Sequence, residues 1–182
     1  MIEVRFHGRG GQGVVTAAKI LANAFVRQGK FGSSFPMFGF ERRGAPVTAF
    51  MRFDKDPIRE KTQIYNPDCL VVLDTSQKDS PMVYSGLKPD GVLILNTKEP
   101  IHEKPCKDLS RAGLVDAEKI ALEEIGIPSP NTPIVGAFAA ATGWIPIEHI
   151  LSGLEQYFSG DILKQNIRCA KRGFHEVEVI QW

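Results

Sequence analysis

Apolar and charged side chains alternate at the start of the chain, from residue 2 to residue 6. A period of two is typical of a short β-strand with one buried face. A glycine-rich segment at 8–13 follows, and apolar residues then recur at helical spacing over 14–28 until Gly29, a residue that commonly ends helices. The first thirty residues therefore predict a strand, a tight turn and a helix.

The next hundred residues continue with strand patterns. Residues 31–35 and 47–53 are predicted strands, separated by a loop at 36–46. Residues 69–73 and 92–95 are continuous apolar runs, each followed by a polar residue. Continuous runs of this length are typical of parallel strands that are buried on both faces of a sheet.

The last third of the chain is predicted to be mainly helical. A short strand is expected at 114–116, and helices are expected at 117–125, 133–142, 147–158 and 161–172. Strands alternating with helices predict an α/β fold, Rossmann-like and doubly wound, with a mostly parallel sheet and a helical C-terminal third. Its 182 residues fit one domain, spanning 1–182.

Composition and charge restrict the functional classes. With 43% hydrophobic residues the chain can build a sizeable core, and its net charge of +1 does not favour nucleic-acid binding. No signal peptide or membrane-spanning run is recognised, so a cytoplasmic protein without membrane contact is expected. The three cysteines form no CxxC pair. A metal or iron–sulfur site held by this chain alone is therefore not expected.

The glycine-rich segment carries candidate binding chemistry. Gly8, Gly10 and Gly13 form a G-x-G-x-x-G pattern between a predicted strand and a predicted helix. Glycines allow close approach to a ligand, and the free N–H groups and dipole at a helix start attract a phosphate. Arg9 and Gln12 add donors within the loop. The alternative is a tight structural turn that holds no ligand.

Nicotinamide binding is a second alternative, and one feature is missing for it. A dinucleotide site needs an acidic residue about 20 residues beyond the glycine loop to bind the ribose. Residues 32–35 are Gly-Ser-Ser-Phe, and no Asp or Glu occurs in this region before Glu41. A stand-alone NAD(P)-binding reductase is therefore disfavoured, although it remains an alternative.

The loop after the second predicted strand is unusually apolar. Phe35, Met37, Phe38 and Phe40 lie together in a segment that should be solvated. Clustered exposed apolar residues usually mark an interface, so these four are candidates for contact with a partner protein. The alternative is that they fold under the loop as a small satellite core.

Two arginines, Arg42 and Arg43, follow this apolar cluster directly. Guanidinium groups offer forked donors that suit phosphates and carboxylates. Their alternative role is ordinary solvation.

No catalytic motif is recognised, and no catalytic residue is assigned. The triplet 74–76, Asp-Thr-Ser, follows a buried strand at the edge where α/β proteins bind ligands, but a helix cap is the favoured interpretation. His7 abuts the glycine loop and is interpreted as a structural histidine at a strand end. The other three histidines have no metal-ligand spacing.

Several segments together resemble a known family, the gamma subunits of 2-oxoacid:ferredoxin oxidoreductases. The glycine loop at 8–14 and the Glu-Arg-Arg-Gly segment at 41–44 carry most of the resemblance, since the pair is far more specific than either half. Residues 131–143 and 166–173 resemble later parts of the family. The match covers almost the whole chain. Pyruvate synthase and ketoisovalerate oxidoreductase belong to this family.

The resemblance implies a Rossmann-like subunit in a larger enzyme. Such an enzyme converts a 2-oxoacid and coenzyme A into acyl-CoA, CO2 and reduced ferredoxin, and pyruvate is the first candidate substrate. Thiamine diphosphate, Mg and iron–sulfur clusters are expected in partner subunits, named alpha, beta and delta. The gamma chain is implicated in coenzyme A binding without a redox centre of its own. A purely structural scaffold subunit remains the other alternative.

The resemblance also suggests site residues. The loop residues Gly8, Arg9, Gly10, Gly11, Gln12 and Gly13 would face the coenzyme A phosphates, and Arg42 and Arg43 would add charge. Asn131 and Asn166 are further candidates for cofactor binding. A single Asn is more often a helix cap than a ligand, which is the alternative for both.

Overall fold

Seven strands form one mixed sheet in the computed structural model, which describes residues 1–37 and 44–182. The strands are β1 (Ile2–Arg9), β2 (Phe31–Pro36), β3 (Pro46–Asp54), β4 (Cys69–Val72), β5 (Gly91–Asn96), β6 (Leu109–Val115) and β7 (Glu178–Gln181). Their order across the sheet is β2-β3-β1-β4-β5-β6-β7. β1, β4, β5 and β6 pair in parallel, whereas β2, β3 and β7 add antiparallel pairings at the two sides. The predicted α/β class, with parallel strands in its middle, is confirmed.

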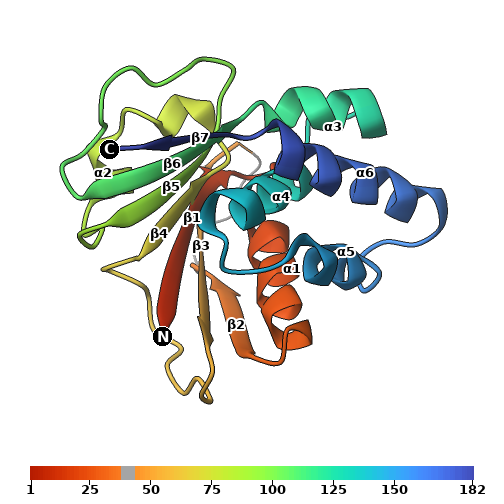
Figure 1. Cartoon of the computed structure of the whole chain (residues 1–182), viewed down its shortest axis with the longest axis horizontal. Helices are drawn as coiled ribbons and strands as arrows, with labels where there is room; N and C mark the ends of the chain where they lie inside the picture. Colours follow the sequence, from red (N-terminus) through yellow and green to blue (C-terminus); the bar gives the residue numbers. More distant parts are fainter. Residues whose placement is uncertain (38–43) are drawn as a thin grey trace.

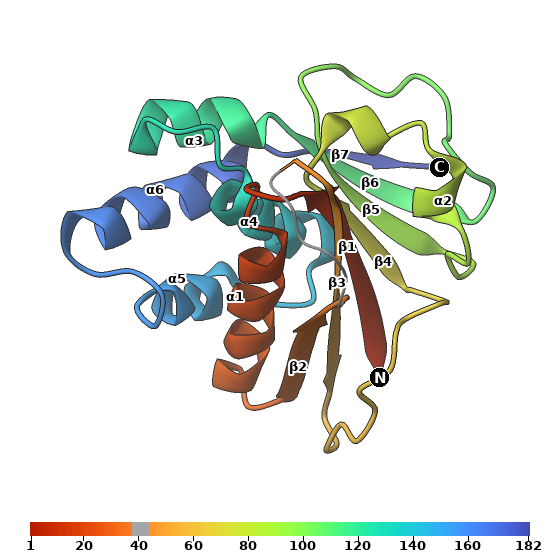
Figure 2. The same cartoon turned by 180° about the vertical axis from the view of Figure 1, so that it is seen from behind.

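The helices are distributed unequally over the two faces of this sheet. They are α1 (Val14–Arg27), α2 (Pro81–Tyr84), α3 (Ala117–Ile125), α4 (Asn131–Thr142), α5 (Ile147–Leu154) and α6 (Gly160–Glu176), with the 3-10 helix η1 at Thr75–Gln77. The five longer helices lie on one side of the sheet, and α2 lies on the other (Figures 1 and 2). The predicted helical C-terminal third supplies four of the five.

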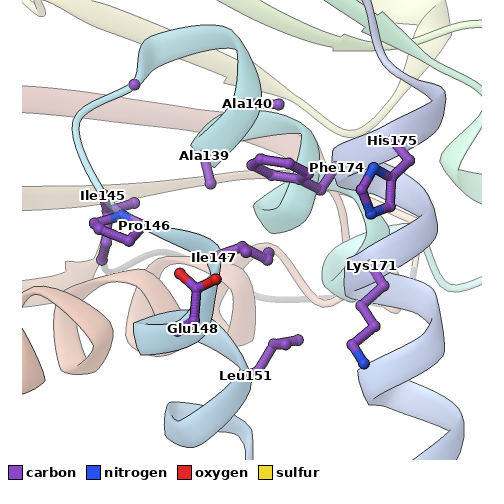
Figure 3. Close-up of a pocket in the computed structure, with 11 residues that line it drawn as sticks. Ala139, Ala140, Ile145, Pro146, Ile147, Glu148, Leu151, Lys171, Phe174 and His175 are labelled. Atoms are coloured by element: carbon purple, nitrogen blue, oxygen red, sulfur yellow. The ribbon is translucent and has the colours of Figure 1, made fainter.

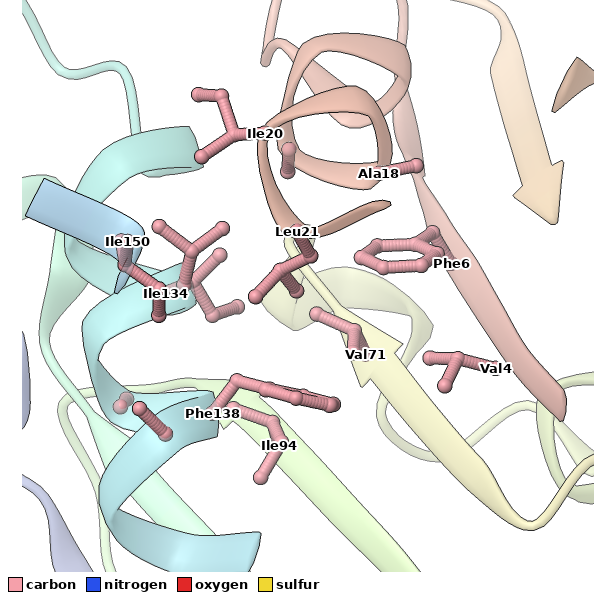
Figure 4. Packing of buried hydrophobic residues seen from close by; sticks show 14 of the residues in the cluster. Val4, Phe6, Ala18, Ile20, Leu21, Val71, Ile94, Ile134, Phe138 and Ile150 are labelled. Carbon is pink, nitrogen blue, oxygen red and sulfur yellow. The ribbon is translucent and has the colours of Figure 1, made fainter. Parts of the chain in front are cut away.

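The main core lies between the sheet and the longer helices. Val4 and Phe6 of β1 and Val71 of β4 meet Leu21 of α1 and Phe138 of α4 (Figure 4). All five side chains are buried. The alternation of β1 and the helical spacing of α1 place these residues on facing surfaces, and their burial provides the main driving force for folding.

The opposite face has a smaller core and two buried arginines. Leu70, Leu93 and Leu95 pack there beneath α2. On the same face, Arg5 and Arg52 are 8% and 2% exposed. Buried guanidinium groups need partners, and each arginine donates to backbone carbonyls of the segment that connects β3 to β4.

Element boundaries differ from the sequence pattern in several places. The helix predicted at 133–142 begins at Asn131, the helix predicted at 147–158 ends at Leu154, and the strand predicted at 114–116 begins at Leu109. β7 and α2 were not predicted. Both are only four residues long, so neither covers enough positions for a periodic pattern to be recognised.

Candidate ligand-binding site

The glycine loop joins β1 to α1 at the carboxyl edge of the parallel strands. Gly11 and Gly13 have φ values of 98° and 76°, a region that L side chains rarely adopt. The loop is also tied to the chain before β3, because Gly10 N–H donates to the Ala45 carbonyl at 2.9 Å and Gly44 N–H donates to the Gly10 carbonyl at 3.2 Å. These bonds give the loop a fixed shape.

The start of α1 has no side-chain cap. Its N-cap residue is Gly13, and the first turn holds no acidic residue. The first helical hydrogen bond runs from Ala17 N–H to the Gly13 carbonyl at 2.9 Å. The N–H groups of Val14, Val15 and Thr16 form no hydrogen bond with the described residues. These donors and the helix dipole together favour an anion at this position.

α4 begins beside the same loop. A β-carbon placed on Gly13 would lie 2.7 Å from Asn131 Nδ2, so the Asn131 side chain packs directly against Gly13. Asn131 Oδ1 accepts from Ser129 Oγ at 3.1 Å and from Thr132 N–H at 2.9 Å. The amide nitrogen therefore lies at the loop, where the N-termini of two helices meet.

The loop borders a change in chain direction across the sheet. After β1 the chain passes to the face covered by α1, and after β4 it passes to the face covered by α2. Ligands of α/β proteins bind at the carboxyl ends of strands where the connections diverge in this way. The carboxyl edge of β1 and β4 is therefore the position in this fold that suits a ligand.

Arg9 lies across the carboxyl edge of β1 and β4 and is held by the protein itself. Its Nε lies 2.6 Å from Asp74 Oδ2, its Nη2 donates to Ser76 Oγ at 3.1 Å, and its Nη1 donates to the Gly44 carbonyl at 3.2 Å. The carboxylate of Asp74 offsets much of the positive charge of Arg9. Asp74 also caps η1, as its sequence position predicted, by accepting from Ser76 N–H at 3.2 Å.

Gln12 and Gln77 also stabilise the loop. Gln12 Oε1 accepts from Arg9 N–H at 2.7 Å, so this side chain folds back over its own turn. Gln77 Nε2, from the segment after β4, donates to the Gly8 carbonyl at 3.1 Å. Gln77 was not predicted, because its partner is 69 residues away and no local pattern marks the pair.

The predicted site residues thus fall into different places. The six loop residues and Asn131 lie together at the start of α1. Asn166 does not join them: it is 3% exposed, accepts from Thr132 Oγ1 at 2.7 Å and donates to the Ile162 carbonyl at 2.9 Å. Its amide connects α4 to α6. Arg42 and Arg43 lie outside the described residues.

The predicted partner surface is described only in part, because Phe38 and Phe40 lie outside the described residues. Phe35 belongs to β2 and not to a loop, and its ring packs near that of Phe50 at a centroid distance of 5.3 Å. Met37 is 43% exposed and is anchored by its N–H to the Thr48 carbonyl at 2.8 Å. Of the two described members of this set, Met37 is the exposed one.

His7 lies one residue before the loop and is held neutral. Burial, together with the positive charge of Arg5, lowers the pKa of His7 to about 3. Arg5 Nε donates to His7 Nε2 at 3.0 Å, and a guanidinium group has no acceptor. His7 Nε2 is therefore unprotonated, and the single ring proton is on Nδ1. This is the structural histidine that the sequence favoured.

The described residues show neither a metal-binding group nor a membrane-spanning helix. No three His, Cys, Asp or Glu side chains there come together in a group that could hold a metal ion. No helix among them combines the length and apolarity needed to cross a membrane.

Comparison with known proteins places the chain in a family. The model of the pyruvate ferredoxin/flavodoxin oxidoreductase family matches residues 3–176. The common gamma subunit of the pyruvate/ketoisovalerate oxidoreductases of Pyrococcus furiosus is 53% identical over the full length of both chains. The crystal structure of pyruvate oxidoreductase subunit PORC from Thermotoga maritima has a TM-score of 0.85 and 37% identity, covering 99% of this chain and 98% of that one.

A more distant structure shares the fold within a longer chain. The 2-oxoglutarate:ferredoxin oxidoreductase of Magnetococcus marinus, solved with 2-oxoglutarate, coenzyme A and succinyl-CoA bound, has a TM-score of 0.73 and 18% identity. The match covers 94% of this chain and 30% of that one. With the full-length matches above, the conclusion is that this chain belongs to the pyruvate ferredoxin/flavodoxin oxidoreductase family, as a gamma-type subunit.

Proposed function

We propose that this chain binds the phosphate groups of coenzyme A at the start of α1, within a multi-subunit 2-oxoacid:ferredoxin oxidoreductase. The observation that carries the proposal is the set of N–H groups at Val14, Val15 and Thr16 without an acceptor among the described residues. A phosphate accepts from several such donors at once, and the helix dipole adds a favourable field.

The surrounding residues fit an anionic guest in size and in charge. A β-carbon on Gly11 would meet no atom of the described residues within 4 Å, so these residues leave open space at the outer side of the loop. Asn131 contributes a neutral amide donor beside Gly13. The positive charge of Arg9 is offset by Asp74. We therefore assign the additional positive charge for the phosphates to Arg42 and Arg43. These two residues immediately precede Gly44, which is bound to the loop.

The reaction itself is assigned to the complete enzyme. A 2-oxoacid, with pyruvate as the first candidate, reacts with coenzyme A to give acyl-CoA, CO2 and reduced ferredoxin. Thiamine diphosphate with Mg supplies the decarboxylation chemistry, and iron–sulfur clusters carry the electrons to ferredoxin, all in the alpha, beta and delta subunits. This chain contributes no catalytic residue. By fixing the phosphate end of coenzyme A, it lowers the entropic cost of bringing the thiol to the acyl group.

The decisive test is the Asn131→Asp variant in the reconstituted enzyme. The substitution keeps the size of the side chain and places a negative charge at two helix N-termini, where it should not destabilise the fold. The same charge repels a phosphate. We expect the KM for coenzyme A to rise about fivefold, which corresponds to about 1 kcal/mol, while the KM for the 2-oxoacid stays constant.

A matched control is available on the same layer of helices. Asn23→Asp makes the same chemical change near the other end of α1, where Asn23 pairs with Gln156. It should leave both KM values unchanged. Arg42→Ala and Arg43→Ala should each raise the KM for coenzyme A. If Asn131→Asp and both arginine variants leave it at the wild-type value, the loop is a structural turn and the subunit is a scaffold.

A further inference from the structure

A second hollow lies at the other end of α4, away from the glycine loop. It is a groove with a volume of about 800 Å³ between the C-terminal half of α4, the segment leading into α5, and α6 (Figure 3). The residues that define this α4–α5–α6 groove include Ala139, Ala140, Gly143, Ile147, Leu151 and Phe174. None of these residues belongs to the proposed coenzyme A site.

The floor and the walls of the groove differ in size. The floor is formed by small residues of α4, Ala139 and Ala140, and by its C-cap Gly143. Ile147, Leu151 and Phe174 form the walls, and all three are half-buried. A floor of small residues lets another backbone approach closely, and apolar walls on both sides of it suit helix-in-groove packing.

Charges of both signs border the groove. Glu148 lies on the α5 side, and Lys171 and His175 lie one turn apart on α6 (Figure 3). None of the three forms an ion pair with another described residue.

The side of α6 that faces α3 is different. Arg168 pairs with Glu124 at 2.7 Å, and Arg172 contacts Glu123 at 2.8 Å. The basic side chains on the α3 side of α6 are thus paired within the chain, whereas the two beside the groove have no ion pair with a described residue. The charges beside the groove are therefore available to charged groups of another molecule.

We propose that the α4–α5–α6 groove receives a helix of a sister subunit of the same oxidoreductase. That helix presents an apolar ridge to the floor, an acidic side chain to Lys171 and His175, and a basic one to Glu148. A second copy related by a two-fold axis through the groove would set one hollow against another, which favours a different chain as the occupant. The proposal rests on the subunit character of the family and is independent of coenzyme A binding.

The first test is co-expression of the complete set of subunits, followed by measurement of the gamma content of the purified complex by native mass spectrometry. Leu151→Lys places a charge on the groove wall and should weaken association more than tenfold. Leu122→Lys makes the same change at a 54%-exposed position of α3 outside the groove and should have no effect. Thermal unfolding of each isolated variant checks that the chain still folds. Full retention of a folded Leu151→Lys chain would overturn the proposal.

The second test identifies the occupant. Zero-length carbodiimide coupling of the intact complex joins a lysine to a carboxylate in direct contact, and peptide mass spectrometry identifies both. Lys171 should couple to an acidic residue of a sister subunit, and Lys171→Gln should remove that product. A Lys171 product formed only with a second gamma chain, or the absence of any Lys171 product in a complex that retains the subunit, would contradict the assignment.

Discussion

Two helices start at the same edge of the sheet, and their first turns are built in opposite ways. α1 follows β1 and α3 follows β6, both of them strands of the parallel region. The Asp116 carboxylate caps α3 by accepting from Lys119 N–H at 3.1 Å, and Glu118 adds negative charge to its first turn. α1 has a glycine at the same position and no acid. Among the described residues, the start of α3 has a carboxylate partner, whereas the first N–H groups of α1 have no acceptor.

The open start of α1 is a consequence of geometry as well as composition. A side chain that caps a helix start belongs to an N-cap residue with an extended backbone, usually Ser, Thr, Asp or Asn. Gly13 has a left-handed backbone with φ of 76° and lies against Asn131. A capping side chain therefore has neither the backbone nor the space at residue 13, and no other described residue caps these N–H groups.

Of the substitutions that test this comparison, Gly13→Ala should cause the largest loss in stability. The new methyl group would combine a strained backbone with a 2.7 Å approach to Asn131, and we expect a loss of about 3 kcal/mol in the free energy of unfolding. Gly126→Ala is the matched change at the end of α3, where φ is 83° and an added β-carbon would meet no described atom within 4 Å. It should cost about 1 kcal/mol, from backbone strain alone. Urea unfolding of the isolated chain measures both, and equal losses would show that the contact with Asn131 is unimportant.

The second effect concerns the charge of His7, one residue before the glycine loop. The pKa of His7 is lowered to about 3, so the attraction of the loop for an anion does not depend on a titrating imidazolium near neutral pH. In the unfolded chain the same group has its ordinary pKa of 6.5. Between these values the unfolded state binds more protons, so His7 stabilises the fold above pH 6.5 and this stability is lost as pH falls toward 3.

The resulting prediction is a loss of about 2 kcal/mol attributable to His7 between pH 7 and pH 5. His7→Gln retains an acceptor for Arg5 and should remove this part of the pH dependence, while carboxylate titrations remain in both proteins. Unfolding free energies at the two pH values give the difference. Nitrogen NMR of the imidazole provides an independent check, because the wild-type ring should remain neutral with its proton on Nδ1 at pH 5. A ring that titrates near 6.5 would contradict the Arg5 contact.

Local patterns predicted the strands and helices that are long and periodic, but not how the strands are ordered. The apolar runs of β4 and β5 are buried on both faces, as continuous runs predict. The position of β2 was not predictable, because β3 pairs between β1 and β2 through contacts that no local pattern records.

The strand order is a second feature that disfavours nicotinamide binding. The acidic residue of a dinucleotide site follows a strand adjacent to β1, whereas here the adjacent strand on that side is the antiparallel β3. The β3 strand begins at the carboxyl edge, where the second strand of a dinucleotide-binding unit would end. The fold therefore disfavours that alternative more strongly than a missing acid at 32–35 does.

The candidate site was predictable where it depends on neighbours in sequence. The G-x-G-x-x-G spacing identified the loop, since turn and helix start are local features. The roles of Arg9 and Asn166 were not predictable, because Arg9 pairs with Asp74 across 65 residues and Asn166 with Thr132 across 34. The same residue types serve as ligands or as internal partners, and only the three-dimensional contacts distinguish the two.

Removal of the α3 cap is the smallest of these effects and tests the other half of the comparison. Asp116→Ala deletes both the hydrogen bond to Lys119 N–H and the charge at the helix start, and should cost about 1 kcal/mol. Asp116→Asn keeps an oxygen acceptor and should lose only about 0.3 kcal/mol, a difference that added salt reduces. Neither variant should change the KM for coenzyme A in the complete enzyme. A rise in that KM equal to the one caused by Asn131→Asp would mean that the two helix starts serve one site, and the contrast between a capped and an open start would no longer locate the anion.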